Sequence, residues 1–336
     1  GFERSLVEQS GVAFAAHHEV RAGPVHGVNP LRMLVSGGKL VAGTAQALGL
    51  LRRYRPQAIL STGGWVSFPL ALAARLRRVP LLIFLPDVEP GLTIRVLRRF
   101  ATEIALNVAD SAQYFPGSRT VVTGYPLRAA MTDLARPENR EQARQRAQAH
   151  FGLDPTRPTL LVFGGSLGAR AVNRGFVDVL GEVLADGAQV IHLTGRLDWD
   201  RSQEQAGALA DHADYHAFPY LHEDMALAFA AADLAICRAG ASILAECPLF
   251  GLPSILIPLA YSWRYQQVNA DYLAGRGAAI HLDEGEMPAR LLPLIRELLG
   301  DADRLGAMRE QARRLACADG AANVAQTLTR LAQDKR

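Results

Sequence analysis

The spacing of apolar residues along the chain divides it into strands and helices. Short continuous apolar runs, such as 81–85 and 159–163, are typical of strands that are buried on both faces of a parallel sheet. Between these runs, apolar residues recur every three or four positions, which predicts amphipathic helices. Because parallel neighbouring strands need a crossover connection, the alternation predicts an α/β fold built from doubly wound parallel sheets.

The predicted strands fall into two groups. A strand at 12–16 and a helix at 31–55 come first, and the first group of strands then follows at 57–60, 81–85, 104–108 and 120–123. The second group lies at 159–163, 189–194, 214–218, 233–237, 253–257 and 278–282. The tail from residue 288 to 331 is helical, with a break near 318–320. Two Rossmann-like domains facing a cleft follow from this grouping.

A charged and polar segment separates the two groups. Residues 132–157 are helical in character, and the segment finishes among prolines at Pro155 and Pro158. Such a composition is typical of a joint between domains. We therefore predict an N-terminal domain at 1–131, a linker at 132–157, a C-terminal domain at 158–317 and a final helix at 318–336 that packs back on the first domain.

Composition narrows the class of protein. An apolar content of 49% with 21% charged residues describes an ordinary globular chain, and a net charge of +3 is too small to indicate a nucleic-acid partner. The uncharged run 56–74 contains Gly63, Gly64 and Pro69, so it predicts a strand, a loop and a helix rather than a membrane span. The three cysteines form no Cys-x-x-Cys pair and suit a reducing compartment.

The strongest candidate site follows the strand 159–163. That strand runs directly into Gly164-Gly-Ser-Leu-Gly168, and a helix is predicted from about Ala171. A helix start carries unpaired N–H groups and a partial positive charge, glycines allow a ligand to approach the backbone, and Ser166 adds a hydroxyl donor. The pattern favours a phosphate-binding loop. A glycine-rich turn without a ligand is the alternative for this stretch alone.

Two familiar phosphate motifs do not fit this loop. The Walker A sequence ends in Gly-Lys-Ser or Gly-Lys-Thr, whereas Gly168 is followed by Ala169-Arg170. The dinucleotide fingerprint requires a glycine where Ser166 stands, and it requires an acidic residue after the next strand. In this chain the next strand, 189–194, is followed by Gly195-Arg196 instead. The loop therefore belongs to neither class.

Two Asp-x-Asp sequences, Asp198-Trp-Asp200 and Asp301-Ala-Asp303, are candidates for binding a metal ion. The first is predicted to begin a helix, and the second is predicted to lie between two helices. Carboxylates are common at such positions because they accept from free N–H groups and complement the helix dipole. We expect these residues to serve the helices, and we expect no metal site.

Several motifs resemble, in combination, those of the MurG family, and the likeness runs over nearly the whole chain. MurG proteins are peptidoglycan N-acetylglucosaminyltransferases of glycosyltransferase family 28, and the resemblance implies their GT-B fold. The motifs that carry it are Gly124-Tyr-Pro-Leu-Arg128, Gly164-Gly-Ser-Leu-Gly-Ala-Arg170, Glu223-Asp-Met225, Asp233-Leu-Ala-Ile-Cys-Arg-Ala-Gly-Ala-Ser-Ile-Leu-Ala-Glu246 and Tyr265-Gln-Gln-Val-Asn-Ala270.

The resemblance implies a donor site in the second domain. Arg128 and the loop of Gly164, Gly165, Ser166 and Gly168 would hold the UDP diphosphate. Glu246 would accept hydrogen bonds from the ribose hydroxyls, Gln266 would contact the sugar, and the backbone around His222 would pair with uracil. The turn that resembles the family's ribose-binding turn comprises Ala241, Ser242, Ile243, Leu244, Ala245 and Glu246.

The acceptor side departs from the family pattern. The family's opening Gly-Gly-Thr-Gly-Gly-His loop, with its histidine proposed as base, would lie before Gly1, so we expect a truncated N-terminus. The family's His-Glu-Gln-Asn segment is here Phe84-Leu-Pro-Asp87, and Asp87 is a candidate for accepting a proton or for contacting the donor; we favour contact. Gly63, Gly64 and Trp65 resemble the loop that faces the acceptor pyrophosphate.

The activity that the resemblance implies is inverting transfer of N-acetylglucosamine from UDP-N-acetylglucosamine to lipid I, undecaprenyl-pyrophosphoryl-MurNAc-pentapeptide, giving lipid II for the cell wall. UDP departs without a metal or other cofactor. The implied partners are UDP-N-acetylglucosamine, the polyprenyl-linked muramyl acceptor and the cytoplasmic face of the bacterial membrane, where the protein would be peripheral. A basic helix end at Arg52, Arg53 and Arg55 is either solvated or faces that membrane.

Other functions remain open from the sequence. The first keeps the chemistry and changes the acceptor to a diacylglycerol or another polyprenyl sugar. The second is a UDP-sugar-binding module without turnover, since the opening loop is missing from the sequence. The third is a UDP-sugar 2-epimerase of the same fold, for which the sequence shows no extra acidic groups at the cleft.

Overall fold

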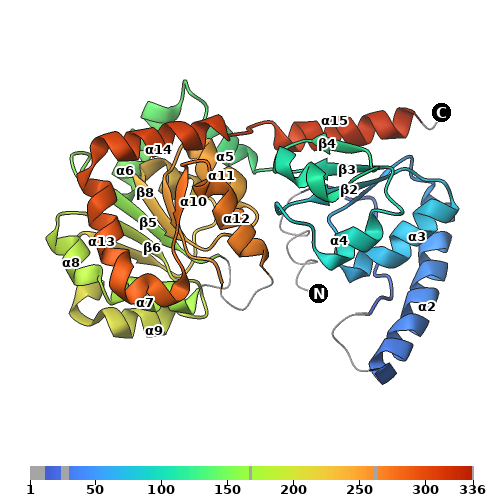
Figure 1. Ribbon diagram of the computed structural model, residues 1–336, viewed down its shortest axis with the longest axis horizontal. Helices are drawn as coiled ribbons and strands as arrows, with labels where there is room; N and C mark the ends of the chain where they lie inside the picture. Colours follow the sequence, from blue (N-terminus) through green and yellow to red (C-terminus); the bar gives the residue numbers. More distant parts are fainter. Residues whose placement is uncertain (1–11, 24–29, 166–168, 260–263, 335–336) are drawn as a thin grey trace.

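The computed structural model describes residues 12–23, 30–165, 169–259 and 264–334 (Figure 1). These residues form two lobes side by side, each of which contains a parallel β-sheet with helices packed around it. The predicted α/β fold with two doubly wound sheets is therefore confirmed. No helix in the described ranges is both long enough and apolar enough to cross a membrane.

The first lobe is built on a four-stranded parallel sheet in the order β1-β2-β3-β4. Strand β2 is buried at every position, as its unbroken apolar run predicts. The strands are β1 (Ile59–Ser61), β2 (Leu81–Leu85), β3 (Glu103–Leu106) and β4 (Thr120–Val122). The helices are α2 (Pro30–Tyr54), α3 (Phe68–Leu76) and α4 (Leu92–Leu97), with the 3₁₀ helices η1 (Trp65–Ser67) and η2 (Ala109–Tyr114).

One predicted strand of this lobe is wrong. Residues 12–16 adopt no strand, and the side chains of Val12 and Phe14 are each 59% exposed. An apolar run becomes a strand only when a neighbouring strand and a packed face accept it. The run 56–74, in contrast, forms the strand, loop and helix that were predicted for it.

The second lobe contains a six-stranded parallel sheet in the order β10-β9-β8-β5-β6-β7. The chain begins in the middle at β5, moves outward through β6 and β7, and returns to the other side of β5 with β8. This reversal between β5 and β8 opens a crevice at the carboxyl ends of the two strands, which is where doubly wound sheets bind ligands. The strands are β5 (Thr159–Phe163), β6 (Gln189–Leu193), β7 (Tyr215–Phe218), β8 (Leu234–Cys237), β9 (Ser254–Leu256) and β10 (Ala279–His281).

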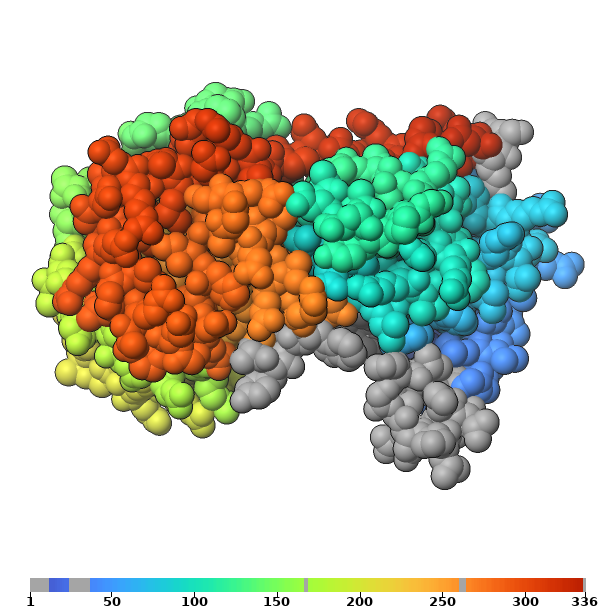
Figure 2. Space-filling model, in the orientation of Figure 1, coloured from blue at the N-terminus to red at the C-terminus, as the bar shows by residue number. Residues whose placement is uncertain are grey.

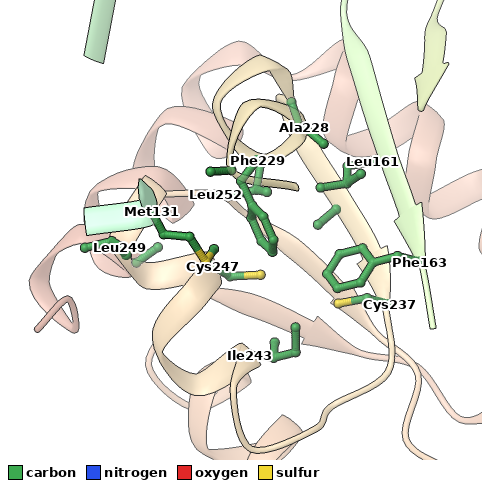
Figure 3. Packing of buried hydrophobic residues seen from close by; sticks show 14 of the residues in the cluster. Met131, Leu161, Phe163, Ala228, Phe229, Cys237, Ile243, Cys247, Leu249 and Leu252 are labelled. Carbon is green, nitrogen blue, oxygen red and sulfur yellow. The ribbon is translucent and has the colours of Figure 1, made fainter. Parts of the chain in front are cut away.

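Helices cover both faces of this second sheet. On one face, Phe163 of β5 packs edge to face on Phe229, with ring centroids 5.4 Å apart, and Cys237 and Ile243 lie in the same apolar cluster (Figure 3). The helices are α5 (Ala129–Leu134), α6 (Arg140–Phe151), α7 (Arg170–Val177), α8 (Leu180–Ala185), α9 (Trp199–Ala206), α10 (Met225–Ala231), α11 (Ile243–Phe250), α12 (Tyr265–Ala274), α13 (Met287–Gly300) and α14 (Ala302–Arg314), with the 3₁₀ helices η3 (Gly207–Asp211) and η4 (Glu284–Glu286).

Helix α6 lies inside the segment 132–157 that the sequence suggests as a linker. Its Ala147 and Phe151 are buried in the core cluster of the second lobe, and the helix packs against α10. The segment reads as polar because a single face of α6 is apolar and the opposite face is charged. Most of this stretch is thus an integral layer of the second lobe.

A hydrogen-bonded histidine stands in the core of the second lobe. The ring of His192 on β6 is fully buried, with Nδ1 2.8 Å from the Tyr215 hydroxyl and Nε2 3.1 Å from Oδ1 of Asn173. Asn173 donates its own amide to the Thr194 carbonyl, so its oxygen accepts from Nε2–H and Nδ1 accepts from Tyr215. Burial lowers the pKa of His192 to about 3, which keeps the ring neutral.

The chain crosses between the lobes twice, and the two crossings touch. A Cβ at Gly320 would lie 2.1 Å from the Tyr125 carbonyl oxygen, and one at Gly124 would lie 2.4 Å from Sγ of Cys317. The second crossing leads into α15 (Gly320–Gln333), which runs along the first lobe with Val324 and Leu331 packed in one cluster with residues of β2 and β3 (Figure 1). The last helix thus ties the end of the chain to the first lobe.

Candidate functional site

A cavity of 260 Å³ opens at the carboxyl edge of the second sheet, where the order of the strands reverses. Because all of these strands are parallel, the loops that leave them meet at this edge. Backbone and side chains from widely separated parts of the chain line the cavity. The polar side chains and glycines among them are Arg128, Gly164, Gly165, Gly195, Tyr220, Arg238, Gly240, Ser242, Glu246 and Gln266.

The two positions after β5 favour glycine for different structural reasons. A Cβ at Gly164 would stand 2.1 Å from the Cβ of Ala169, so only glycine lets the loop close against the start of α7. Gly165 has a φ of +100°, a conformation that favours glycine, and among the described residues no atom beyond its chain neighbours lies within 4 Å of where its Cβ would be. Bare backbone therefore lines the cavity beside a helix start. Ser166 and Gly168, the other predicted members of the loop, lie outside the described residues.

Glu246 reaches the same cavity from α11, the helix that follows β8. The Ser242 hydroxyl donates to its Oε2 at 3.0 Å. Burial raises the pKa of Glu246, while the hydrogen bond from Ser242 and the positive charge of Arg128 oppose that rise. A fixed carboxylate on a cavity wall is a hydrogen-bond acceptor for a neighbouring pair of hydroxyls. The remaining predicted members of this turn, Ala241, Leu244 and Ala245, do not line the cavity.

Arg128 brings a guanidinium to the cavity from the first crossing between the lobes. Its Nη1 donates to the carbonyl of His222 at 3.1 Å. The side chain stands at the start of α5 and is largely exposed, so its other N–H groups face open space beside the cavity. A guanidinium offers donors in a planar fork that matches phosphate oxygens.

His222 does not line this cavity. Its Nε2 lies 3.1 Å from Nη2 of Arg196, and because arginine carries only donors, Nε2 is the acceptor. The ring also packs edge to face on Tyr220 at 4.5 Å between centroids, and the Arg196 guanidinium lies over that same Tyr220 ring. These contacts fix the loop after β7, while its backbone remains beside Arg128.

Gln266 lines the cavity from the first turn of α12. Its Oε1 accepts from the backbone N–H of Leu259, which follows β9. The amide is thus oriented by one hydrogen bond while its Nε2 group can donate to a ligand. Gln266 also borders a second hollow beside Arg170 and Glu284.

Asp87 lies across the seam between the lobes, just after β2, and it does not line the cavity. Its Oδ1 accepts from Nδ2 of Asn269 at 2.9 Å, and Oδ1 of Asn269 accepts from the backbone N–H of Val88 at 3.1 Å. Burial raises the pKa of Asp87, and the Asn269 hydrogen bond opposes that rise. Figure 2 shows α12, which carries Asn269, abutting the first lobe at this waist.

Asn269 and Arg238 are site residues to which the sequence gave no role. Asn269 is 1% exposed and also donates to the carbonyl of Ala239, so it joins the first lobe to the loop after β8. Arg238 lines the cavity and is held by the Ile257 carbonyl and by Glu284 at 2.7 Å. Arg238 directly follows β8, and Asn269 lies within the motif at the start of α12. These positions were the signals in the sequence that could have indicated a role.

The loop at Gly63, Gly64 and Trp65 occupies the carboxyl edge of the first sheet. Both glycines have positive φ, +90° and +82°, and Ser67 donates to the Gly63 carbonyl at 2.6 Å. Trp65 begins η1, and Val66 beside it is 64% exposed. Gly64 is exposed, and Gly63 is half-buried against Ile94.

The Asp-x-Asp sequences lie at the starts of helices. Asp301 accepts from the backbone N–H of Arg304 at 2.9 Å as the N-cap of α14, and Asp198 precedes α9 and pairs with Arg170 at 3.1 Å. In the part of the chain that the structure describes, no three His, Cys, Asp or Glu side chains gather closely enough to hold a metal ion.

The chain is similar over most of its length to proteins of one glycosyltransferase family. The glycosyltransferase family 28 C-terminal domain matches residues 159–327, and the glycosyltransferase family 28 N-terminal domain matches residues 1–106. A curated UDP-N-acetylglucosamine--N-acetylmuramyl-(pentapeptide) pyrophosphoryl-undecaprenol N-acetylglucosamine transferase from Roseiflexus sp. (strain RS-1) is 38% identical over 97% of this chain and 80% of its own length. The protein of the same name from Symbiobacterium thermophilum is 35% identical over 100% of this chain and 87% of its own.

The chain belongs to the MurG family of glycosyltransferases. The predicted family is thereby confirmed. Among solved structures, Acinetobacter baumannii MurG superimposes with a TM-score of 0.77 at 27% identity, covering 98% of this chain and 88% of that one. A UDP-N-acetylglucosamine 2-epimerase from Neisseria meningitidis superimposes at 0.60 with 12% identity, covering 87% of this chain and 82% of that one, which shows a shared fold alone.

Proposed function

We propose that this protein transfers N-acetylglucosamine from UDP-N-acetylglucosamine to a polyprenyl-linked muramyl acceptor, lipid I, giving lipid II. The observation that carries the proposal is that Glu246, Arg128 and the glycines after β5 line one cavity. The names of the curated relatives support this donor and this acceptor. The donor domain spans 158–317 in this proposal.

In the proposed donor complex, the diphosphate rests on N–H groups of the loop after β5, with Ser166, Gly168 and Arg128 completing the cradle. Glu246 accepts from the ribose hydroxyls, and the backbone near His222 pairs with uracil. Gln266 donates to the hydroxyls of the transferred sugar. These roles match the chemistry of each group, since an N–H or guanidinium binds a phosphate and a carboxylate binds a diol.

Catalysis in this proposal is mainly electrostatic. The acceptor hydroxyl attacks C1 of the sugar in line, which inverts the configuration at C1; the C1–oxygen bond to UDP breaks, and the hydroxyl proton passes to water. Negative charge grows on the departing diphosphate, and the start of α7 together with Arg128 stabilises that charge without a metal ion. Asp87 contacts donor or acceptor hydroxyls at the seam, since Asn269 already holds one of its oxygens.

The acceptor lies on the first lobe in this proposal. The backbone of Gly63 and Gly64, next to Trp65, faces the acceptor pyrophosphate. The protein binds the cytoplasmic face of the membrane peripherally, with Arg52 and Arg53 in the last turn of α2 meeting anionic headgroups.

The donor site is tested by Glu246→Ala. Loss of the acceptor for the ribose hydroxyls should weaken UDP binding in calorimetry by about 1–2 kcal/mol, roughly five- to thirtyfold. Glu182→Ala, an exposed carboxylate on α8, is the matched control and should bind UDP like the native chain. An unchanged affinity of the Glu246 variant would remove this residue from the site.

The reaction itself is tested by turnover. Native protein incubated with UDP-N-acetylglucosamine and lipid I should release UDP and form lipid II. Binding of UDP without transfer would favour a UDP-sugar-binding module, and transfer only to a diacylglycerol or another polyprenyl sugar would change the acceptor. Formation of the manno isomer without any acceptor would make the protein an epimerase.

A further inference from the structure

A second polar cavity, of 360 Å³, lies in the second lobe between α6, α11 and α14. It lies toward the opposite edge of the sheet from the donor cavity. Asp233 on its wall precedes β8, at the amino end of that strand, whereas the donor loops follow the carboxyl ends of the strands. Four arginines line it: Arg140 and Arg144 from α6, and Arg309 and Arg313 from α14. We call this cavity the arginine pocket.

Asp233 is the anchor of the arginine pocket. Its carboxylate accepts from Arg144 at 2.9 Å, from Arg309 at 3.3 Å and from the backbone N–H of Thr159 at 3.0 Å. Its two oxygens are therefore fully engaged in holding α6 and α14 to the first residue of β5. One carboxylate is shared by two arginines and a backbone donor.

The other two arginines have no carboxylate partner among the described residues. Arg140 donates Nε to the Ala135 carbonyl, a neutral group. Arg313 lies on the backbone of Gly251, where a Cβ would stand 2.6 Å from its Cγ, so the glycine that ends α11 makes room for this side chain. The other lining carboxylate, Glu141, already accepts from Gln145 at 2.8 Å.

The pocket is lined by four guanidinium groups and two carboxylates, so its lining carries a net positive charge. Burial lowers the pKa of Arg309, and the charges of Arg144 and Arg313 lower it further against the opposing effect of Asp233. Burial and the charge of Arg140 likewise lower the pKa of Arg313. Like charges gathered around a hollow repel one another, and an anion in the hollow removes that cost.

We propose that the arginine pocket binds a phosphate-type oxyanion through Arg140 and Arg313. Guanidinium groups present paired N–H donors that match tetrahedral oxyanions, and Arg140 is oriented by the Ala135 carbonyl while the exposed Arg313 can turn toward the hollow. Inorganic phosphate and pyrophosphate share this chemistry with the phosphate of a lipid headgroup. The site is separate from the donor cavity, and it does not depend on the function proposed above.

Calorimetry with inorganic phosphate and with pyrophosphate tests the proposal. The full chain is titrated at an ionic strength held constant with sodium chloride, and any oxyanion binding at the donor cavity is measured as the binding that remains in the Arg140→Gln/Arg313→Gln double variant. The native chain should bind the oxyanion, and Arg313→Gln and Arg140→Gln should each weaken binding about tenfold or more, since each removes a charge-assisted contact. Arg313→Lys should bind with intermediate affinity.

Matched controls exist on the same helices. Arg314→Gln removes an exposed arginine that pairs with Glu310, and Arg146→Gln removes an exposed arginine of α6; both should bind like the native chain. Absence of oxyanion binding by the native chain, or equal affinity of the native chain and the Arg140→Gln/Arg313→Gln double variant, overturns the proposal. Circular dichroism and an unchanged midpoint of thermal unfolding establish that each variant is folded.

Vesicles distinguish the two sources of phosphate. Capture on phosphatidylcholine vesicles containing phosphatidic acid, lost in the double variant and displaced by soluble phosphate, assigns the pocket to a lipid headgroup. Binding of soluble oxyanion without such capture assigns it to the free ion. Both results support the phosphate chemistry of the pocket.

Discussion

The two lobes place their ligand-facing loops at the same kind of edge, yet they enclose them differently. In the second lobe, the loops after the strands close around a cavity of 260 Å³ whose carboxylate is already held by Ser242. In the first lobe, Gly63 is half-buried against Ile94, Gly64 is exposed, and Val66 beside them is 64% exposed. The described loop of the first lobe thus carries an exposed apolar side chain, whereas the loops of the second lobe line a cavity.

This difference fits two substrates of different kinds. A nucleotide sugar is small and polar, and tight binding requires donors and acceptors that are fixed before it arrives. An acceptor carried on a lipid approaches from a surface, and a loop with bare backbone can meet it there. Changes in pH and in single residues test this difference between the lobes.

Acid should destabilise the second lobe through His192. Its folded pKa of about 3 lies below the ordinary 6.5, so between these values the unfolded chain binds a proton that the folded chain does not. Stability therefore falls as pH drops below 6.5, by about 1.4 kcal/mol per unit and about 2.7 kcal/mol by pH 4.5. Urea unfolding at several pH values measures this slope, and His192→Gln should reduce it. An equal slope in both proteins would contradict the account.

The rigidity of the donor pocket is tested at Gly164. In Gly164→Ala, the new Cβ would meet Ala169 at 2.1 Å, so the loop and the start of α7 must move apart. We expect UDP binding to weaken by about 2 kcal/mol, roughly thirtyfold. Gly181→Ala is the control, because the nearest atom to its new Cβ, on Leu209, lies at an ordinary 3.6 Å. Native affinity in the Gly164 variant would mean that the pocket is not preformed.

The contact between the lobes should depend on one buried residue. Asn269→Ala leaves the Val88 N–H and the Ala239 carbonyl without partners and frees Asp87, so kcat/KM should fall by about 1 kcal/mol, roughly fivefold.

The exposed interlobe ion pair between Arg276 and Asp110, at 2.7 Å, provides the comparison. Arg276→Gln should change kcat/KM by less than about twofold, because exposed ion pairs contribute little. A larger loss in the Arg276 variant than in the Asn269 variant would reverse this ranking of the interlobe contacts.

Much of the fold could be predicted from the sequence because buried parallel strands are continuous apolar runs. Strands β2 and β5 begin and end where their runs do. The error at residues 12–16 has a physical cause, since an apolar run needs a partner strand that the run itself does not specify. The helical character of α6 was predicted, but its packing into the second lobe was not, because its polar face dominates its composition.

The residues of the candidate site also divide into those that could be predicted from the sequence and those that could not. Gly164 and Glu246 could be located because each follows a strand at the edge where such sheets bind ligands. Asn269 could not be given a role, since its partners Asp87 and Val88 are 182 and 181 residues away and meet it only across the seam.

The sequence by itself determined the two sheets, the glycine loop after β5 and the resemblance to the MurG family, because these depend on local spacing and on motifs that are continuous in the chain. The tertiary structure alone decided that Arg128 reaches the loop of His222, that Asn269 joins the lobes, and that four arginines line one cavity with Asp233. Contacts of this kind arise from how separate elements pack, and packing is a property of the folded chain as a whole.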